Sequence, residues 1–109
     1  MVTLSTVSGV TVVAIEGSID SNSVPNVQKQ VFEGIEGKDK VVLDMKKVSF
    51  LSSAGLRMLM LIYRQLKSRN GKVVLVSVME EIVEVMKMTG FISFFVIADN
   101  MDAGIKALG

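Results

Sequence analysis

Short apolar runs and helix-like apolar stripes alternate along the chain. β-Branched residues fill residues 2–14 on both sides of a turn signal at Ser8-Gly9, which predicts a strand pair reaching Gly17. Residues 40–44 form a nearly continuous apolar run, a pattern typical of a strand that is buried on both faces. The same reasoning predicts two later strands, over residues 72–77 and 94–98.

Between the predicted strands, apolar residues recur three and four positions apart, as they do on the buried side of an α-helix. Ser23 and Pro25 mark the start of the first helix, because serine caps free N–H groups and proline is tolerated in the first turn. Asn70-Gly71 is a typical stop for the longest helix. The four predicted helices run from Val24 to Gly37, from the Ser52-Ser53 loop to about Arg69, from Glu80 to Met88 and from Asp102 to Leu108.

The order of these elements predicts an α/β fold with a mixed β-sheet of four to five strands and about four α-helices. The later strands are expected to form parallel units that are joined by helical crossovers. The 109 residues contain no internal repeat and no linker. Residues 1–109 are therefore expected to form a single domain.

Histidine and cysteine are both missing from the composition. Their absence excludes Ser-His-Asp and Cys-His nucleophiles, thiol redox chemistry, disulfides and any zinc site built from these residues. A net charge of +1 and an aromatic content of only five Phe and one Tyr argue against nucleic-acid binding. We expect no catalytic residue, no metal and no cofactor.

Neither a signal peptide nor a membrane span is predicted. The first residues lack the basic start and the unbroken apolar stretch of a signal peptide. The richest apolar stretch, residues 56–66, is interrupted by Arg57 and Arg64, and no run approaches the ~20 residues that cross a bilayer. We expect a soluble, cytoplasmic monomer that binds no membrane.

The segment that joins the strand at 40–44 to the long helix is the best candidate for a functional site. In an α/β sheet this junction lies at the carboxyl end of a strand, where ligands usually bind. Small residues at 52–55 leave the start of the helix accessible, and its free N–H groups favour a phosphate or carboxylate. Ser53 is either a phosphate acceptor or a simple N-cap, and its position alone favours the cap.

The long helix carries apolar residues on two sides. The side expected to face the core consists of Leu56, Leu59, Met60, Tyr63 and Leu66. The other side carries Ala54, Met58 and Leu61, which are either covered by a second helix or exposed as a patch for a partner. For an exposed patch, Met58→Asp is expected to weaken partner binding without unfolding the chain. Arg57, four residues after Ser53, is either a free surface residue or a cation that meets a phosphate there.

Three segments of the chain form a recognisable set. They are Leu43-Asp44 followed by residues 48–56 (Val-Ser-Phe-Leu-Ser-Ser-Ala-Gly-Leu), residues 17–20 (Gly-Ser-Ile-Asp) and the tail at 78–108. Together they resemble the signature, the Gly-x-Leu-Asp segment and the closing pattern of STAS domains, specifically those of bacterial anti-sigma factor antagonists. The resemblance covers essentially the whole chain and implies a sheet surrounded by helices.

The resemblance also implies a partner switch rather than an enzyme. In such a switch, the unphosphorylated antagonist binds an anti-sigma factor that is also a serine kinase, and the sigma factor is released. The kinase then phosphorylates the antagonist, which weakens the complex, and a serine phosphatase resets it. Carried over by motif, the acceptor is Ser53. The residues expected at or beside the docking surface are Asp20, Ser49, Ser52, Ser53, Ala54, Gly55 and Leu56, to which the apolar patch adds Met58 and Leu61.

Several alternatives stay open at this point. Ser52 stands where the family often has an aspartate, so Ser52 is an alternative acceptor. A STAS subunit of another signalling or lipid-transport assembly is an alternative within the family. A receiver domain is suggested by residues 41–44, although its acidic pair and its late Lys-Pro pair are missing. An oxygen-ligand metal site would need Asp20 and Asp44 to act together.

Overall fold

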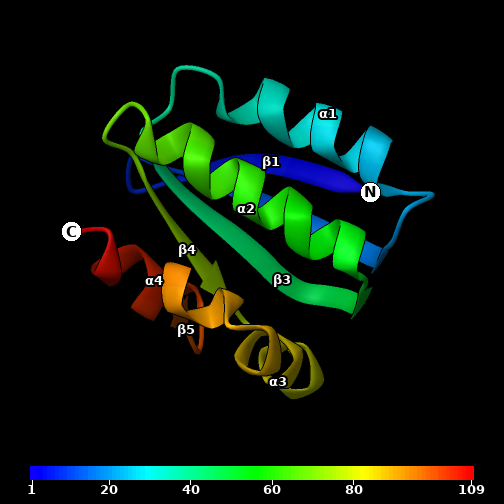
Figure 1. Cartoon of the computed structure of the whole chain (residues 1–109). Helices are drawn as coiled ribbons and strands as arrows, with labels where there is room; N and C mark the ends of the chain where they lie inside the picture. Colours follow the sequence, from blue (N-terminus) through cyan, green and yellow to red (C-terminus); the bar gives the residue numbers. More distant parts are fainter.

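The computed structural model describes residues 1–109 and contains one sheet with the strand order β1-β2-β3-β4-β5 (Figure 1). The strands are β1 (Val2–Val7), β2 (Val10–Ile19), β3 (Lys40–Leu51), β4 (Lys72–Val76) and β5 (Val96–Ala98). β1 pairs antiparallel with β2 across a turn in which Ser8 and Gly9 both have positive φ angles. All other strand pairs are parallel, so the mixed sheet predicted from the sequence is confirmed.

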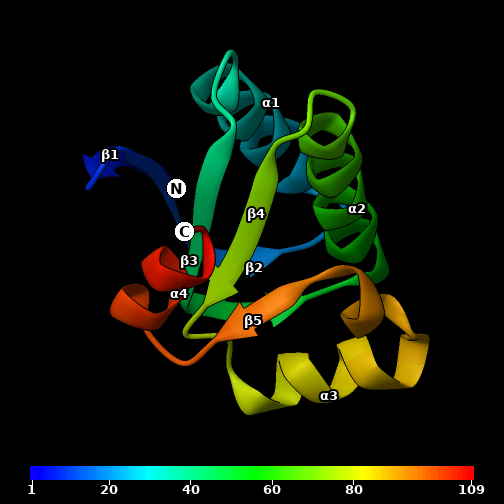
Figure 2. The ribbon, with the colours of Figure 1, turned by 90° about the vertical axis from the view of Figure 1, so that its left-hand side faces the viewer.

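Helices cover both faces of this sheet. α1 (Val24–Ile35) and α2 (Ser53–Lys67) lie side by side on one face, and α4 (Met101–Ala107) covers the other (Figures 1 and 2). α3 (Glu80–Thr89) and a single 3-10 turn, η1 (Phe91–Phe94), contribute side chains to the core on the α2 side. The four predicted α-helices are therefore confirmed, and none of them has the length and apolar character needed to cross a bilayer.

The central strand β3 is covered on both faces over its first half. Val41, Val42 and Leu43 are each 0% exposed. Val41 and Leu43 belong to the larger core beneath α1 and α2, whereas Val42 belongs to the smaller core beneath α4. The strand predicted from the continuous apolar run is thus confirmed as buried on both sides.

β3 extends well beyond residue 44, so the expectation that Asp44 ends this strand is wrong. Pairing with β2 continues to Leu51 and is interrupted by two bulges, each of which adds one residue to β3. The extra residues change the alternation of side chains, and Met45, Val48 and Leu51 are buried at a spacing of three. Because this spacing is not the period of a strand, the sequence pattern favoured a loop here.

Candidate functional site

The carboxyl ends of β2 and β3 bring two of the predicted site residues to one edge of the sheet. Asp20 directly follows β2, and Ser52 directly follows β3. The Ser52 N–H donates to the carbonyl of Ile19 at 2.9 Å, which ties the two strand ends together. The loop that begins with Asp20 and the start of α2 therefore lie side by side, at the edge where the sequence predicts a site (Figure 1).

The two serines at this edge have different roles in the structure. Ser52 is the N-cap of α2, and its hydroxyl oxygen accepts a hydrogen bond from the Gly55 N–H at 3.3 Å. Ser53 is the first residue of the helix, its side chain is exposed, and its hydroxyl makes no hydrogen bond within the chain. A capping role for Ser53 is therefore wrong, because the preceding serine fills it. The Ser52 hydroxyl is engaged and the Ser53 hydroxyl is free.

Asp20 orders the loop that leads into α1. Its Oδ1 atom accepts hydrogen bonds from the N–H groups of Asn22 at 2.9 Å and Ser23 at 3.0 Å. The Ser23 hydroxyl oxygen in turn accepts from the Asp20 N–H at 3.0 Å. Both carboxylate bonds use the same oxygen, so Oδ2 of this half-buried side chain makes no hydrogen bond within the chain.

Gly55 allows the first turn of α2 to lie directly on the strand ends. A Cβ atom at this position would come within 2.5 Å of Leu51 Cδ1 and 3.1 Å of the Ile19 carbonyl oxygen. The small residue therefore admits the backbone of the chain's own β2 rather than that of a partner. Gly55 is buried and Leu56 is only 4% exposed, so these two residues lie beneath the surface around Ser53 rather than on it.

Four exposed residues of α2, at the spacing of three and four that aligns residues on a helix, form a strip: Ser53, Arg57, Leu61 and Arg64. Gln65 and Lys67 near the end of the helix are exposed as well. Leu61 is 43% exposed, whereas Met58 is 1% exposed and belongs to the core. Tyr63 packs against Phe94 of η1 on one flank of α2. Met58 precedes Tyr63 by five residues and therefore points about 140° away from it around the helix, toward the flank where α1 packs on α2 (Figure 1). Of the two alternatives left open for Met58, cover by a second helix is therefore confirmed and exposure is wrong.

Ser49 and Phe50 are exposed neighbours near the end of β3. The Ser49 Oγ lies 3.5 Å from Ser18 Oγ of β2, and the Phe50 side chain is 53% exposed. The resemblance indicated the segment from Ser49 to Leu56, which includes Phe50. No periodicity signals its exposure, because a bulge turns two consecutive side chains outward. Phe50 and the half-buried Ala54 add apolar surface around Ser53.

Asp20 and Asp44 do not form a shared metal site. Asp44 of β3 pairs with Ala14 of β2, and Asp20 follows the end of β2, six residues after Ala14 and about 20 Å away. The Asp44 Oδ1 atom accepts from the Lys46 N–H at 3.0 Å, a local contact within the strand. No three potential ligands of the types His, Cys, Asp and Glu converge in the chain. The geometry therefore gives no support to the metal-enzyme alternative.

Comparisons with known proteins identify the family to which this fold belongs. The family model described as the STAS domain matches residues 1–104. BtrV of Bordetella bronchiseptica, provisionally named an anti-sigma factor antagonist, is 28% identical over 106 residues, which are 96% of this chain and 91% of BtrV. A Thermotoga maritima protein of known structure, also provisionally named an anti-sigma factor antagonist, has a TM-score of 0.91 at 20% identity, with 98% of this chain and 93% of that chain covered.

The anti-sigma factor antagonist SpoIIAA of Bacillus has been solved in two forms that both resemble this chain. The unphosphorylated form has a TM-score of 0.72 at 15% identity and covers 98% of this chain and 96% of its own. The phosphorylated form has a TM-score of 0.71 at 17% identity and covers 98% and 99%. These likenesses establish the fold, and the family model spans nearly the whole sequence. The chain belongs to the STAS domain family.

Proposed function

We propose that this chain is an anti-sigma factor antagonist that works as a phosphorylation-controlled partner switch in the cytoplasm. Its unphosphorylated form binds an anti-sigma factor that is also a serine kinase, and this binding releases the sigma factor. Phosphorylation of Ser53 by the bound kinase then weakens the complex, and a serine phosphatase restores it. The names of the relatives and the family assignment support this function.

The observation that carries the proposal is the free Ser53 hydroxyl at the start of α2. A phosphate adds a charge of about −2 at this position, next to the positive end of the helix dipole. The added charge is therefore compatible with the folded helix, while it changes what a partner meets at the surface. Ser52 is the weaker candidate as acceptor, because its hydroxyl already accepts the capping hydrogen bond.

The docking surface in this proposal surrounds Ser53 without the buried residues. The buried residues of α2 support this surface by packing in the core and fixing the position of the helix; they include Gly55, Leu56 and Met58. The residues that a partner can reach are Asp20, Ser49, Phe50, Ser52, Ser53, Ala54 and Leu61. A phosphate in the middle of this surface would need a cation from the partner, and without one its desolvation costs several kcal/mol. A loss of that size lowers affinity by orders of magnitude.

The test is a phosphorylation and binding experiment with the serine-kinase anti-sigma factors of the source organism. Each kinase is titrated against the chain without nucleotide, and then incubated with it and ATP before the phosphate is mapped by mass spectrometry. We expect one kinase to bind the wild type and to add one phosphate at Ser53. Ser53→Ala should abolish the label.

Ser52→Ala is the matched control, because it removes a neighbouring hydroxyl and leaves the acceptor. This variant should still be labelled. If the phosphate maps to Ser52 in the wild type, Ser52 rather than Ser53 is the acceptor. No binding and no label with any kinase would overturn the proposal and favour a STAS subunit of another assembly.

A further inference from the structure

An apolar groove borders the exposed strip of α2, on the side away from α1. It has a volume of ≈ 400 Å³ and is lined by Arg57, Met60, Leu61, Arg64, Phe91 and Phe94. Leu61 and Phe94 are 43% and 48% exposed, so two large apolar side chains face solvent at this place. The edge-to-face contact of Phe94 with Tyr63, at 5.9 Å between ring centroids, holds η1 against α2 and fixes the second wall. We refer to this feature as the α2–η1 groove.

The charges around the α2–η1 groove are of one sign. Arg57 and Arg64 are exposed, and neither takes part in an ion pair, since the salt bridge within the chain joins Lys87 to Glu84. No acidic side chain lines the groove. The two arginines are seven residues apart, about 10 Å along the helix axis, and Leu61 lies between them.

A surface with an apolar centre between two unpaired cations is complementary to an apolar side chain flanked by carboxylates. An amphipathic helix presents an apolar side chain between two carboxylates when acidic residues stand one turn before and one turn after the apolar residue. Opposite charges at the rim would set the register and orientation of such a segment. A basic or uncharged segment would leave both guanidinium groups without a counter-charge.

We infer that the α2–η1 groove binds an acidic amphipathic segment of the anti-sigma factor, and that Arg57 links this groove to the phosphate on Ser53. The inference rests on the proposed function and extends its surface along α2 beyond Ser53. Ser53 and Arg57 are four residues apart on the exposed strip, so a phosphate on Ser53 lies within reach of the Arg57 guanidinium. When the phosphate pairs with Arg57, the segment loses one of its two cations and meets a new negative charge.

Arg64 provides an internal comparison for this linkage. It lies eleven residues after Ser53, about 16 Å along the helix axis. This separation is larger than the screening length of about 8 Å at physiological salt, so a phosphate on Ser53 leaves Arg64 nearly unaffected. The two arginines are thus expected to contribute alike to docking, whereas only Arg57 is coupled to phosphorylation.

The first measurement is the dissociation constant of the kinase that binds the wild-type chain, obtained by calorimetry without nucleotide. Arg57→Ala, Arg64→Ala and Leu61→Ser should each weaken binding by about tenfold. Lys72→Ala, which removes an exposed cation at the far end of β4, should leave binding unchanged. Thermal melting of each variant shows that the fold is retained.

If all groove variants bind the kinase with wild-type affinity, the groove is not the docking site, and the proposed antagonist function stands. If the wild type binds no kinase, both the groove inference and the proposed function are wrong. Light scattering of the chain alone tests a different occupant, a second copy. A dimer that Leu61→Ser dissociates would assign the groove to self-association and overturn the inference.

The second measurement uses chains in which phosphoserine is incorporated at position 53 during translation. The ratio of the dissociation constants with and without the phosphate is compared in the wild type, Arg57→Ala and Arg64→Ala. We expect this ratio to fall by about tenfold in Arg57→Ala and to keep its wild-type value in Arg64→Ala. Equal ratios in the three chains would overturn the role of Arg57 as the link.

Discussion

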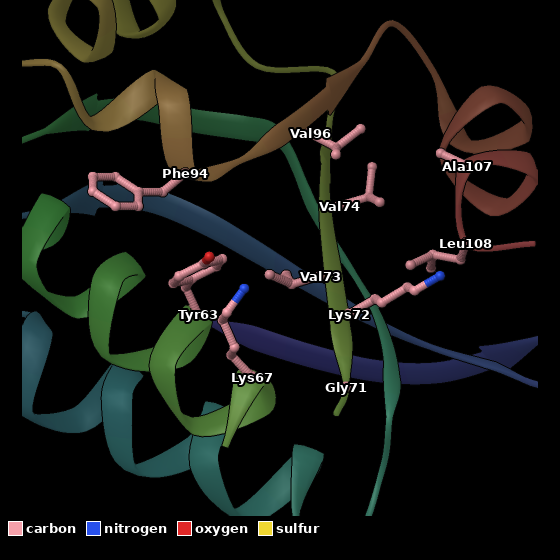
Figure 3. Close-up of a pocket in the computed structure, with 10 residues that line it drawn as sticks. All are labelled: Tyr63, Lys67, Gly71, Lys72, Val73, Val74, Phe94, Val96, Ala107 and Leu108. Carbon is pink, nitrogen blue, oxygen red and sulfur yellow. The ribbon is translucent and has the colours of Figure 1, made fainter. Parts of the chain in front are cut away.

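The two ends of α2 are built in different ways. At the N-terminal end, the Ser52 cap and the close approach of Gly55 to the Ile19 carbonyl fix the first turn beneath a free hydroxyl. At the C-terminal end, a cleft of ≈ 210 Å³ follows the first residues of β4 (Figure 3). Figure 3 shows Lys67 on one side of β4 and Leu108 on the other, so this β4 cleft wraps around the edge of the sheet.

The β4 cleft has a purely structural explanation. β5 is only three residues long and pairs with β4 from Val74 to Val76. Lys72 and Val73 therefore have no neighbouring strand on that side, and the space remains open. The cleft also lies at the amino end of a parallel strand, whereas ligands in α/β sheets usually bind at the carboxyl ends. The comparison teaches that the tightly built start of α2, rather than the cleft at its other end, has the features of a site.

The strongest test of this comparison places a charge beneath the N-terminal half of α2. Met58→Asp should lower the free energy of unfolding by about 4 kcal/mol or more, because it buries an unpaired carboxylate in the core. Leu61→Asp, three residues away on the exposed strip, should change it by less than about 0.5 kcal/mol. Urea denaturation followed by circular dichroism measures both values. Equal stabilities of the two variants would show that α1 does not cover the flank with Met58.

A smaller effect separates the two serines. Ser52→Ala should cost about 1 kcal/mol of stability, because the Gly55 N–H loses its acceptor at the start of α2. Ser53→Ala should be neutral within about 0.3 kcal/mol, since alanine favours the helix and no hydrogen bond is lost. The same denaturation experiment decides the matter. If Ser53→Ala loses more stability than Ser52→Ala, Ser53 rather than Ser52 caps α2.

The sequence predicted the elements of the fold better than the surface of the site. Continuous apolar runs marked β3 and β4 correctly, because a strand covered on both faces has no polar side to hide the pattern. The family resemblance pointed to the edge of the sheet where the ends of β2 and β3 meet in the structure. The second half of β3 was missed, since its two bulges depend on the register with β2, which no local pattern encodes.

The ambiguities at the site have one physical origin. A helical wheel shows which residues share a side of α2, but it does not show how many neighbours the helix has. The wheel separated Met58 and Leu61 from Leu56 and Leu59 but left open whether a second helix covers them. In the structure α1 packs on the flank with Met58 and leaves Leu61 outside. The cap was similarly ambiguous, because two adjacent serines fit the pattern and only the backbone geometry of Ser52 distinguishes them.

The smallest predicted effect compares the two ends of α2 by charge alone. Ser53→Asp places a carboxylate at the first helical residue and should raise the free energy of unfolding by about 0.5 kcal/mol at low salt. Lys67→Asp places the same group in the last turn and should lower it by a similar or larger amount, since a lysine that also contacts the Tyr63 ring is lost. Lys67→Gln removes that contact without adding a negative charge. The difference in the free energy of unfolding between Lys67→Asp and Lys67→Gln therefore measures how the added carboxylate interacts with the helix dipole.

In about 1 M NaCl the effects of Ser53→Asp and Lys67→Asp should both shrink, because the Debye length falls to about 3 Å. A destabilised Ser53→Asp at low salt would mean that the start of α2 does not favour negative charge, and that a phosphate there would strain the fold as well as block the partner.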